Sequence, residues 1–196
     1  MICKEVILWS EYLLVLQLSA KVSEEISAYK DIFKREYQFS NAVITRPHLT
    51  LMKFFQYDSY EALIVNKLKL LAETVSPFNV QLENFGTFGH TIYAHVKTTH
   101  PILEILYHRK EELKPLLCGS KNTFFVSRPH ISIARGLQRK QYAIAWEKWQ
   151  SKKYHANFKT ISMILLKRNK DNFAYKEVKT FYFGGLQIPY LQAKCF

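Results

Sequence analysis

The chain is organised around a short motif that occurs twice. Residues 46–50 read RPHLT, and residues 128–132, 82 positions further on (128 − 46), read RPHIS. In a chain of this composition, a second copy would arise by chance only on the order of a few times in ten thousand. We therefore interpret the pair as an internal duplication, in which a proline fixes the entry to a strand in each copy.

The segments around the two motifs support this interpretation. Apolar runs predict strands, and apolar residues at helical spacing predict helices, with Ser19 as the N-cap of the first helix. The expected strands are 12–18, 48–55, 78–85, 91–96, 129–134, 157–166 and 173–183, and the expected helices are 19–37, 58–74, 101–117 and 138–150. A strand, a helix and a proline-led strand thus recur near residues 12–55 and 91–135. Two half-chains built this way would form two lobes, each a small sheet backed by helices.

Each motif places an imidazole and a hydroxyl on one face of its strand. Side chains at i and i+2 lie roughly 7 Å apart, so His48 accompanies Thr50 and His130 accompanies Ser132, while the residue between them points into the core. A neutral imidazole can take a proton from an attacking water, and a protonated one can give a proton to a leaving oxygen. The ordinary histidine pKa of about 6.5 lets both forms exist near neutral pH.

The two hydroxyls complete this set, because they can donate hydrogen bonds to the non-bridging oxygens of a phosphate. The motif pair therefore predicts phosphoester cleavage, with His48 and His130 as the acid–base pair and Thr50 and Ser132 as phosphate-binding groups. The arrangement requires no metal and no other cofactor. The sequence does not indicate which histidine is the acid and which is the base.

Composition and charge restrict the partners. The formal net charge is +12, from 28 Lys and Arg against 16 Asp and Glu, which favours a polyanion such as RNA or a nucleotide. The basic runs at 152–153 and 167–170 are interpreted as solvated surface. The apolar run at 6–18 is too short and too polar to cross a membrane.

No Gly-, Ser- or Pro-rich linker divides the chain, so we expect residues 1–196 to form one bilobal domain and a monomer. Three cysteines without metal-like spacing predict a reducing, cytoplasmic location.

The paired His-x-Thr and His-x-Ser strands resemble the 2H phosphoesterase superfamily, especially its bacterial branch of 2′-5′ RNA ligases and RNA 2′,3′-cyclic phosphodiesterases. The resemblance extends to HISIAR at residues 130–135 and to GTF at residues 86–88 followed by IYA at residues 92–94. It implies a bilobal α+β fold, with two antiparallel-rich sheets facing a central groove and helices on the outside. It also implies that Arg135 helps to bind phosphate, although strict alternation from His130 would place it on the opposite face unless the strand bulges or ends there.

The expected activity is hydrolysis of a 2′,3′-cyclic phosphate or a 2′-5′ phosphodiester in RNA or a nucleotide, and by analogy weak 2′-5′ ligation. The alternatives are a non-catalytic RNA-binding module and the same chemistry on cyclic ADP-ribose phosphates or cyclic oligonucleotides. The first motif continues as MK at residues 52–53, a departure that leaves the substrate open. Arg46 and Arg128 could steer phosphate or be solvated charges, and Phe88 and Tyr93 could stack on a base or pack in the core.

Overall fold

Two antiparallel sheets form the framework of the protein. The computed structural model describes residues 9–39, 45–107, 113–114, 123–169 and 174–185. One sheet has the order β5-β2-β1-β8-β9, and the other has the order β6-β4-β3-β7. The strands of the five-stranded sheet are β1 (Trp9–Leu16), β2 (Leu49–Tyr57), β5 (Phe124–Phe125), β8 (Ser162–Asn169) and β9 (Lys176–Tyr182). Those of the four-stranded sheet are β3 (Phe78–Thr87), β4 (Thr91–Val96), β6 (His130–Arg135) and β7 (His155–Thr160).

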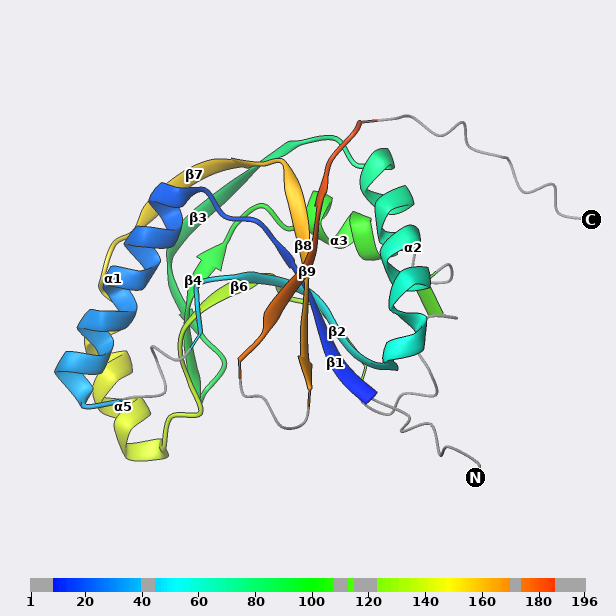
Figure 1. The fold of residues 1–196 in the computed structure, drawn as a ribbon. Helices are drawn as coiled ribbons and strands as arrows, with labels where there is room; N and C mark the ends of the chain where they lie inside the picture. The colour runs from blue at the N-terminus through cyan, green and yellow to red at the C-terminus, as the bar shows by residue number, and fades with distance from the viewer. Residues whose placement is uncertain (1–8, 40–44, 108–112, 115–122, 170–173, 186–196) are drawn as a thin grey trace, which may run out of the picture.

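Helices cover the sheets on opposite sides of the molecule. Helices α1 (Ala20–Tyr37) and α5 (Arg139–Trp149) lie beside the four-stranded sheet, whereas α2 (Glu61–Thr74) lies beside the five-stranded one, after a short 3-10 turn at Asp58–Tyr60 (Figure 1). The Ser19 hydroxyl accepts a 3.3 Å hydrogen bond from the Val22 amide and caps α1 as predicted. Helix α3 (His100–Tyr107) follows β4.

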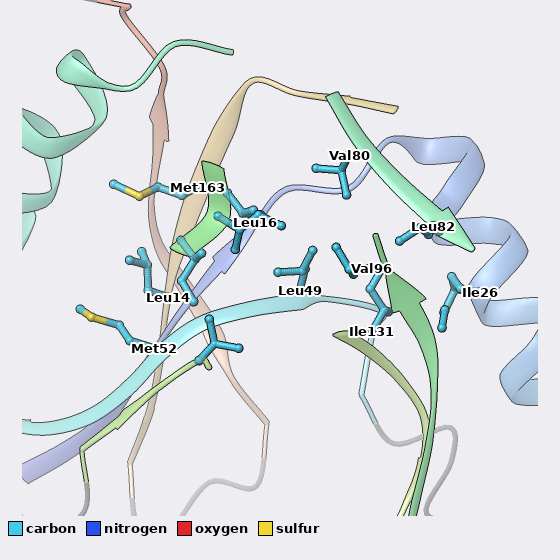
Figure 2. Packing of buried hydrophobic residues seen from close by; sticks show 14 of the residues in the cluster. Leu14, Leu16, Ile26, Leu49, Met52, Val80, Leu82, Val96, Ile131 and Met163 are labelled. Carbon is cyan, nitrogen blue, oxygen red and sulfur yellow. The ribbon is translucent and has the colours of Figure 1, made fainter. Parts of the chain in front are cut away.

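The hydrophobic core joins both sheets. Figure 2 shows apolar side chains from β1, β2, β3, β4, β6, β8 and α1 gathered in one cluster. Leu49 and Ile131, the residues between histidine and hydroxyl in the two motifs, belong to this cluster and have no exposed surface. This confirms the prediction that they point into the core. The motif strands are therefore anchored from behind by the same packing that holds the sheets together.

The predicted α+β fold is confirmed, but the predicted division into two half-chain lobes is wrong. Residues 157–166 were expected to form one strand, but the chain leaves the four-stranded sheet after Thr160 and enters the five-stranded sheet at Ser162. Strands β8 and β9 therefore complete the sheet that holds β1 and β2, so the lobes are not two half-chains. Helix α3 begins at His100, one residue before the expected start, and most of the rest of the expected helix 101–117 lies outside the described residues.

No helix in the described part of the chain is long and apolar enough to cross a membrane. The cytoplasmic location and the monomeric state stay predictions. Cys3, Cys118 and Cys195, on which the predicted location rests, lie outside the described residues.

Candidate functional site

The two histidines are held in the same way. His48 Nδ1 lies 2.8 Å from the carbonyl oxygen of Arg46, and His130 Nδ1 lies 2.8 Å from the carbonyl oxygen of Arg128. Because a carbonyl oxygen only accepts, each Nδ1 carries the proton of the hydrogen bond. In the neutral imidazole, Nε2 is then the atom with a free lone pair, and in the protonated form it is a second donor. Both rings thus present Nε2 for chemistry.

Electrostatics link the two histidines across the sheets. Burial lowers the pKa of His48, the hydrogen bond to the Arg46 carbonyl opposes this, and the charges of Lys30, Arg135 and His130 lower the pKa further. The structure therefore brings the two imidazoles close enough to interact, where β2 and β6 approach each other.

The pKa of His130 is lowered by burial and by the charge of Arg135, against the hydrogen bond to its own motif carbonyl. Both imidazoles are half-buried, as are Thr50 and Ser132. The region is thus positively charged and suited to an anion.

A β-bulge in β6 decides where Arg135 lies. The pairing of β6 with β4 shifts register so that Ile133 has no partner of its own, and Ile133 and Ala134 are both buried. Such an extra residue reverses the alternation of side chains along the strand. Arg135 therefore lies on the same face as His130 and Ser132, the condition under which it could reach a phosphate. Its charge lowers the pKa of both site histidines, in agreement with this placement.

Lys30 of α1 was not predicted as a site residue, yet its amine lies behind the first motif. Lys30 is only 4% exposed, and its Nζ donates to the carbonyl oxygen and, at 3.4 Å, to the hydroxyl of Thr45. Thr45 directly precedes the first motif, so this contact fixes the chain where it enters β2. A signal was present in the sequence: Lys30 falls on the stripe of buried α1 residues that includes Ile26 and Phe33.

Aromatic side chains flank His130. The rings of Phe88 and Tyr93 are stacked with centroids 4.3 Å apart, and their centroids lie 4.9 and 5.2 Å from that of His130. Tyr93 is 9% exposed and Phe88 is 38% exposed. Gly86 makes this packing feasible, because a Cβ there would lie 2.6 Å from the Tyr93 ring. Tyr93 is thus largely a packing residue, whereas the Phe88 ring remains accessible to a ligand.

The remaining basic residues differ in their surroundings. The side chains of Arg46 and Arg128 are exposed, so within the site their backbone carbonyls make the defining contacts. Lys167 and Arg168, expected to be solvated surface, are partly buried and ion-paired. The Lys167 amine, for example, lies 2.9 Å from the Asp58 carboxylate. Within the described residues, no group of three His, Cys, Asp or Glu side chains is placed to hold a metal ion.

A family model and two relatives match most of the chain. A family model described as the 2′-5′ RNA ligase superfamily matches residues 18–172. A protein of Geobacillus sp. is 26% identical over 167 residues, which cover 83% of this chain and 92% of the relative. One from Geobacillus kaustophilus is 26% identical over 166 residues with the same coverage. Both relatives are provisionally named phosphoesterases.

Solved structures share the fold at low sequence identity. TT0787 of Thermus thermophilus is 15% identical with a TM-score of 0.67, covering 90% of this chain and all of that one. LigT of E. coli, crystallised with phosphate, is 13% identical with a TM-score of 0.59, covering 90% of this chain and 98% of LigT. The protein therefore has the fold of LigT and TT0787.

Proposed function

The chain belongs to the 2′-5′ RNA ligase superfamily, and we propose that it hydrolyses 2′,3′-cyclic phosphate or 2′-5′ phosphodiester bonds in RNA or nucleotides. The observation that carries this proposal is the matched pair of histidines, each with Nδ1 bonded to a backbone carbonyl, which leaves Nε2 as the nitrogen for proton transfer. Solved structures of E. coli LigT contain phosphate and 3′-AMP, ligands in keeping with such a substrate. The reverse reaction, 2′-5′ ligation, would use the same groups.

The proposed reaction needs two proton transfers. For a 2′,3′-cyclic phosphate, Nε2 of the neutral histidine takes a proton from water as the water oxygen bonds to phosphorus. The bond from phosphorus to one ribose oxygen breaks, and Nε2–H of the protonated histidine gives its proton to that oxygen. The product is a phosphomonoester on the other ribose oxygen. The two histidines have then exchanged protonation states, and proton exchange with water restores the starting states.

We assign His48 as the base of the hydrolytic direction. Burial and the charge of Arg135 lower the pKa of both histidines, but the charges of Lys30 and His130 add to this only at His48, which keeps its Nε2 available as an acceptor. A bound phosphate offsets this positive charge, so substrate binding favours the protonation of His130 as the acid. Thr50 and Ser132 would donate to the non-bridging oxygens, and Arg135 would balance the negative charge that accumulates on them.

A direct assay tests the proposal. The purified protein would be given an RNA oligonucleotide ending in a 2′,3′-cyclic phosphate and, separately, a 2′-5′-linked dinucleotide, each with and without a chelator. We expect turnover by the wild type, and a loss of at least about 100-fold in His48→Ala and in His130→Ala, since each removes one general acid–base group. The matched control is His100→Ala, because His100 is an exposed histidine at the start of α3.

Three results would contradict the proposal in different ways. Absence of turnover on both substrates would reject the phosphodiesterase activity, and RNA binding without turnover would support the non-catalytic alternative. Turnover that persists in either histidine variant would reject the acid–base pair. Turnover that is lost when chelator is added would reject the metal-independent mechanism.

A further inference from the structure

The bulge that brings Arg135 into the site has a counterpart in the first motif. The pairing of β2 with β1 shifts register so that Leu51 has no partner there, and both Leu51 and Met52 are fully buried. The extra residue is the third after the histidine, as in β6, and it reverses the alternation of side chains between the two faces of the strand. The side chain that returns to the face of His48 and Thr50 is therefore that of Lys53. Each motif strand thus presents a histidine, a hydroxyl two residues later, and a cation five residues after the histidine.

Lys53 belongs to a charged cluster on this face of the five-stranded sheet. Its Nζ lies 3.8 Å from Glu11 Oε1, and Arg168 Nη2 lies 2.6 Å from Glu11 Oε2. The hydroxyl of Tyr175 also donates to Glu11. Burial would raise the pKa of Glu11, but the hydrogen bonds from Tyr175 and Arg168 and the charges of Lys53 and Arg168 outweigh it, so the pKa is lowered and Glu11 stays ionised.

This cluster keeps the capacity to bind an anion. Among the described residues of this cluster, two cations face one carboxylate, which leaves a net positive charge, and the ammonium and guanidinium groups have more donors than Glu11 can accept. The side chains of Lys53 and Arg168 are 41% and 34% exposed, whereas that of Glu11 is 10% exposed. The buried carboxylate of Glu11 therefore orients the solvent-accessible side chains of Lys53 and Arg168.

The cluster is also close to the reacting groups. Lys53 is three residues beyond Thr50 on the same strand face, which corresponds to roughly 7–10 Å along the strand. Across the sheets, the charge of Arg135 reaches Tyr175, whose ring lies 4.8 Å from the Arg168 guanidinium.

We propose that Lys53 and Arg168 form a second phosphate subsite, which binds the phosphate adjacent to the one that reacts. This inference rests on the proposed function and narrows the substrate class. The preferred substrate is a nucleotide chain with at least two phosphates, such as a dinucleotide or oligonucleotide ending in a 2′,3′-cyclic phosphate, rather than a mononucleoside cyclic phosphate. The reacting phosphate lies at the two histidines, and the chain continues along β2 towards Lys53.

The test compares two substrates that differ by one phosphodiester. A mononucleoside 2′,3′-cyclic phosphate and a dinucleotide ending in the same group would be assayed with wild type and Lys53→Met. We expect Lys53→Met to lower kcat/KM for the dinucleotide about tenfold, the lower range for a charged hydrogen bond, and to change the mononucleotide less than about twofold. The dependence of log kcat/KM on log salt should weaken by about 0.7 for the dinucleotide, the contribution of one single-strand phosphate.

Two further variants complete the comparison. Lys53→Arg keeps the charge and should restore the preference for the dinucleotide. Lys97→Met is the matched control, because Lys97 is also a half-exposed lysine paired with a glutamate, at 3.1 Å from Glu83 on the other sheet. It should leave the ratio of the two kcat/KM values unchanged.

The subsite is rejected if Lys53→Met lowers kcat/KM for both substrates equally, or for neither. Binding of the corresponding phosphomonoester products, measured by calorimetry, tests it independently of turnover. If no substrate is hydrolysed but Lys53→Met weakens binding of the dinucleotide product alone, the proposed function fails and the subsite stands. Equal weakening of both products, or of neither, overturns the subsite.

Discussion

The substitution Lys30→Met should stabilise the protein near neutral pH, although it removes a buried side chain. Methionine keeps an unbranched, apolar stem that can fill the space of the lysine stem. What it removes is a charged amine that is 4% exposed and hydrogen-bonded to the carbonyl and hydroxyl oxygens of Thr45. The substitution removes the desolvation cost of the ammonium, which stabilises the folded state, and it removes those hydrogen bonds, which destabilises it. The change in the free energy of unfolding is the difference between these two contributions.

The pKa gives the size of the electrostatic contribution. Burial and the charge of Arg135 lower the pKa of Lys30 from 10.5 to about 8, against the opposing charge of Asp31. At 1.36 kcal/mol per pH unit, the protonated amine destabilises the folded state by about 3 kcal/mol at pH 7. Loss of the hydrogen bonds to Thr45 costs roughly 1–2 kcal/mol, which offsets part of the stabilisation from removing the charge. Lys30→Met should therefore be more stable than the wild type by about 1–2 kcal/mol at pH 7.

The dependence on pH has a defined sign. Because the pKa of Lys30 is lower in the folded state, the unfolded chain binds more protons between pH 8 and 10.5, and stability rises with pH over this window. Relative to Lys30→Met, the wild type should gain about 2.5 kcal/mol between pH 7 and pH 10. Effects of other groups that titrate in this range cancel in the comparison of the two proteins.

Urea unfolding at pH 7 and pH 10 measures this difference. The control is Lys34→Met, because Lys34 is exposed one turn further along α1, and its free energy of unfolding relative to wild type should be the same at both pH values. If the difference between wild type and Lys30→Met is also the same at both pH values, the folded amine does not carry the destabilising charge, and the reasoning is wrong.

Two further predictions concern the groups around the histidines. Arg135→Met removes a positive charge that lowers the pKa of both imidazoles, so both limbs of the pH profile of kcat/KM should move to higher pH, while kcat/KM falls about tenfold or more. Arg139→Met, at an exposed position in α5, should leave the profile in place, and an unmoved profile in Arg135→Met would contradict the assigned electrostatics. Gly86→Ala places a methyl group 2.6 Å from the Tyr93 ring, so we expect overpacking of about 1–3 kcal/mol in urea unfolding and a raised KM. An unchanged unfolding midpoint would show that the ring moves aside without strain.

Most elements of this fold could be predicted because their signals are local. The proline-led motif, the apolar spacing of α1 and the cap at Ser19 each depend on a few neighbouring residues. The change of sheet at Ile161 could not be predicted in this way. The residues on both sides of Ile161 have a sequence pattern typical of a strand, so the pattern does not show a break. In the structure, Thr160 is buried in one sheet and Ser162 in the other, while Ile161 between them is 46% exposed.

The role of Lys30 was missed for a different reason. A lysine on an apolar helical stripe was visible in the sequence, but its partner is a backbone carbonyl in a distant segment. The convergence of the two histidines likewise depends on how β2 and β6 approach each other, which no local pattern specifies. Tertiary packing, rather than local propensity, determined both features.

The two bulges have a consequence for how such motifs are interpreted. Strict alternation from His48 would select Met52 as the next side chain on the site face, but Met52 is fully buried and Lys53 lies on the site face instead. The same shift replaces Ala134 with Arg135 in the second motif. Because the extra residue occupies the same step in both copies, the position five residues after the histidine is a site position in each. A cation there faces the same bound substrate as the histidine and hydroxyl before it, and Lys53, at the adjacent phosphate, should therefore affect substrate choice as directly as Arg135 affects binding of the reacting phosphate.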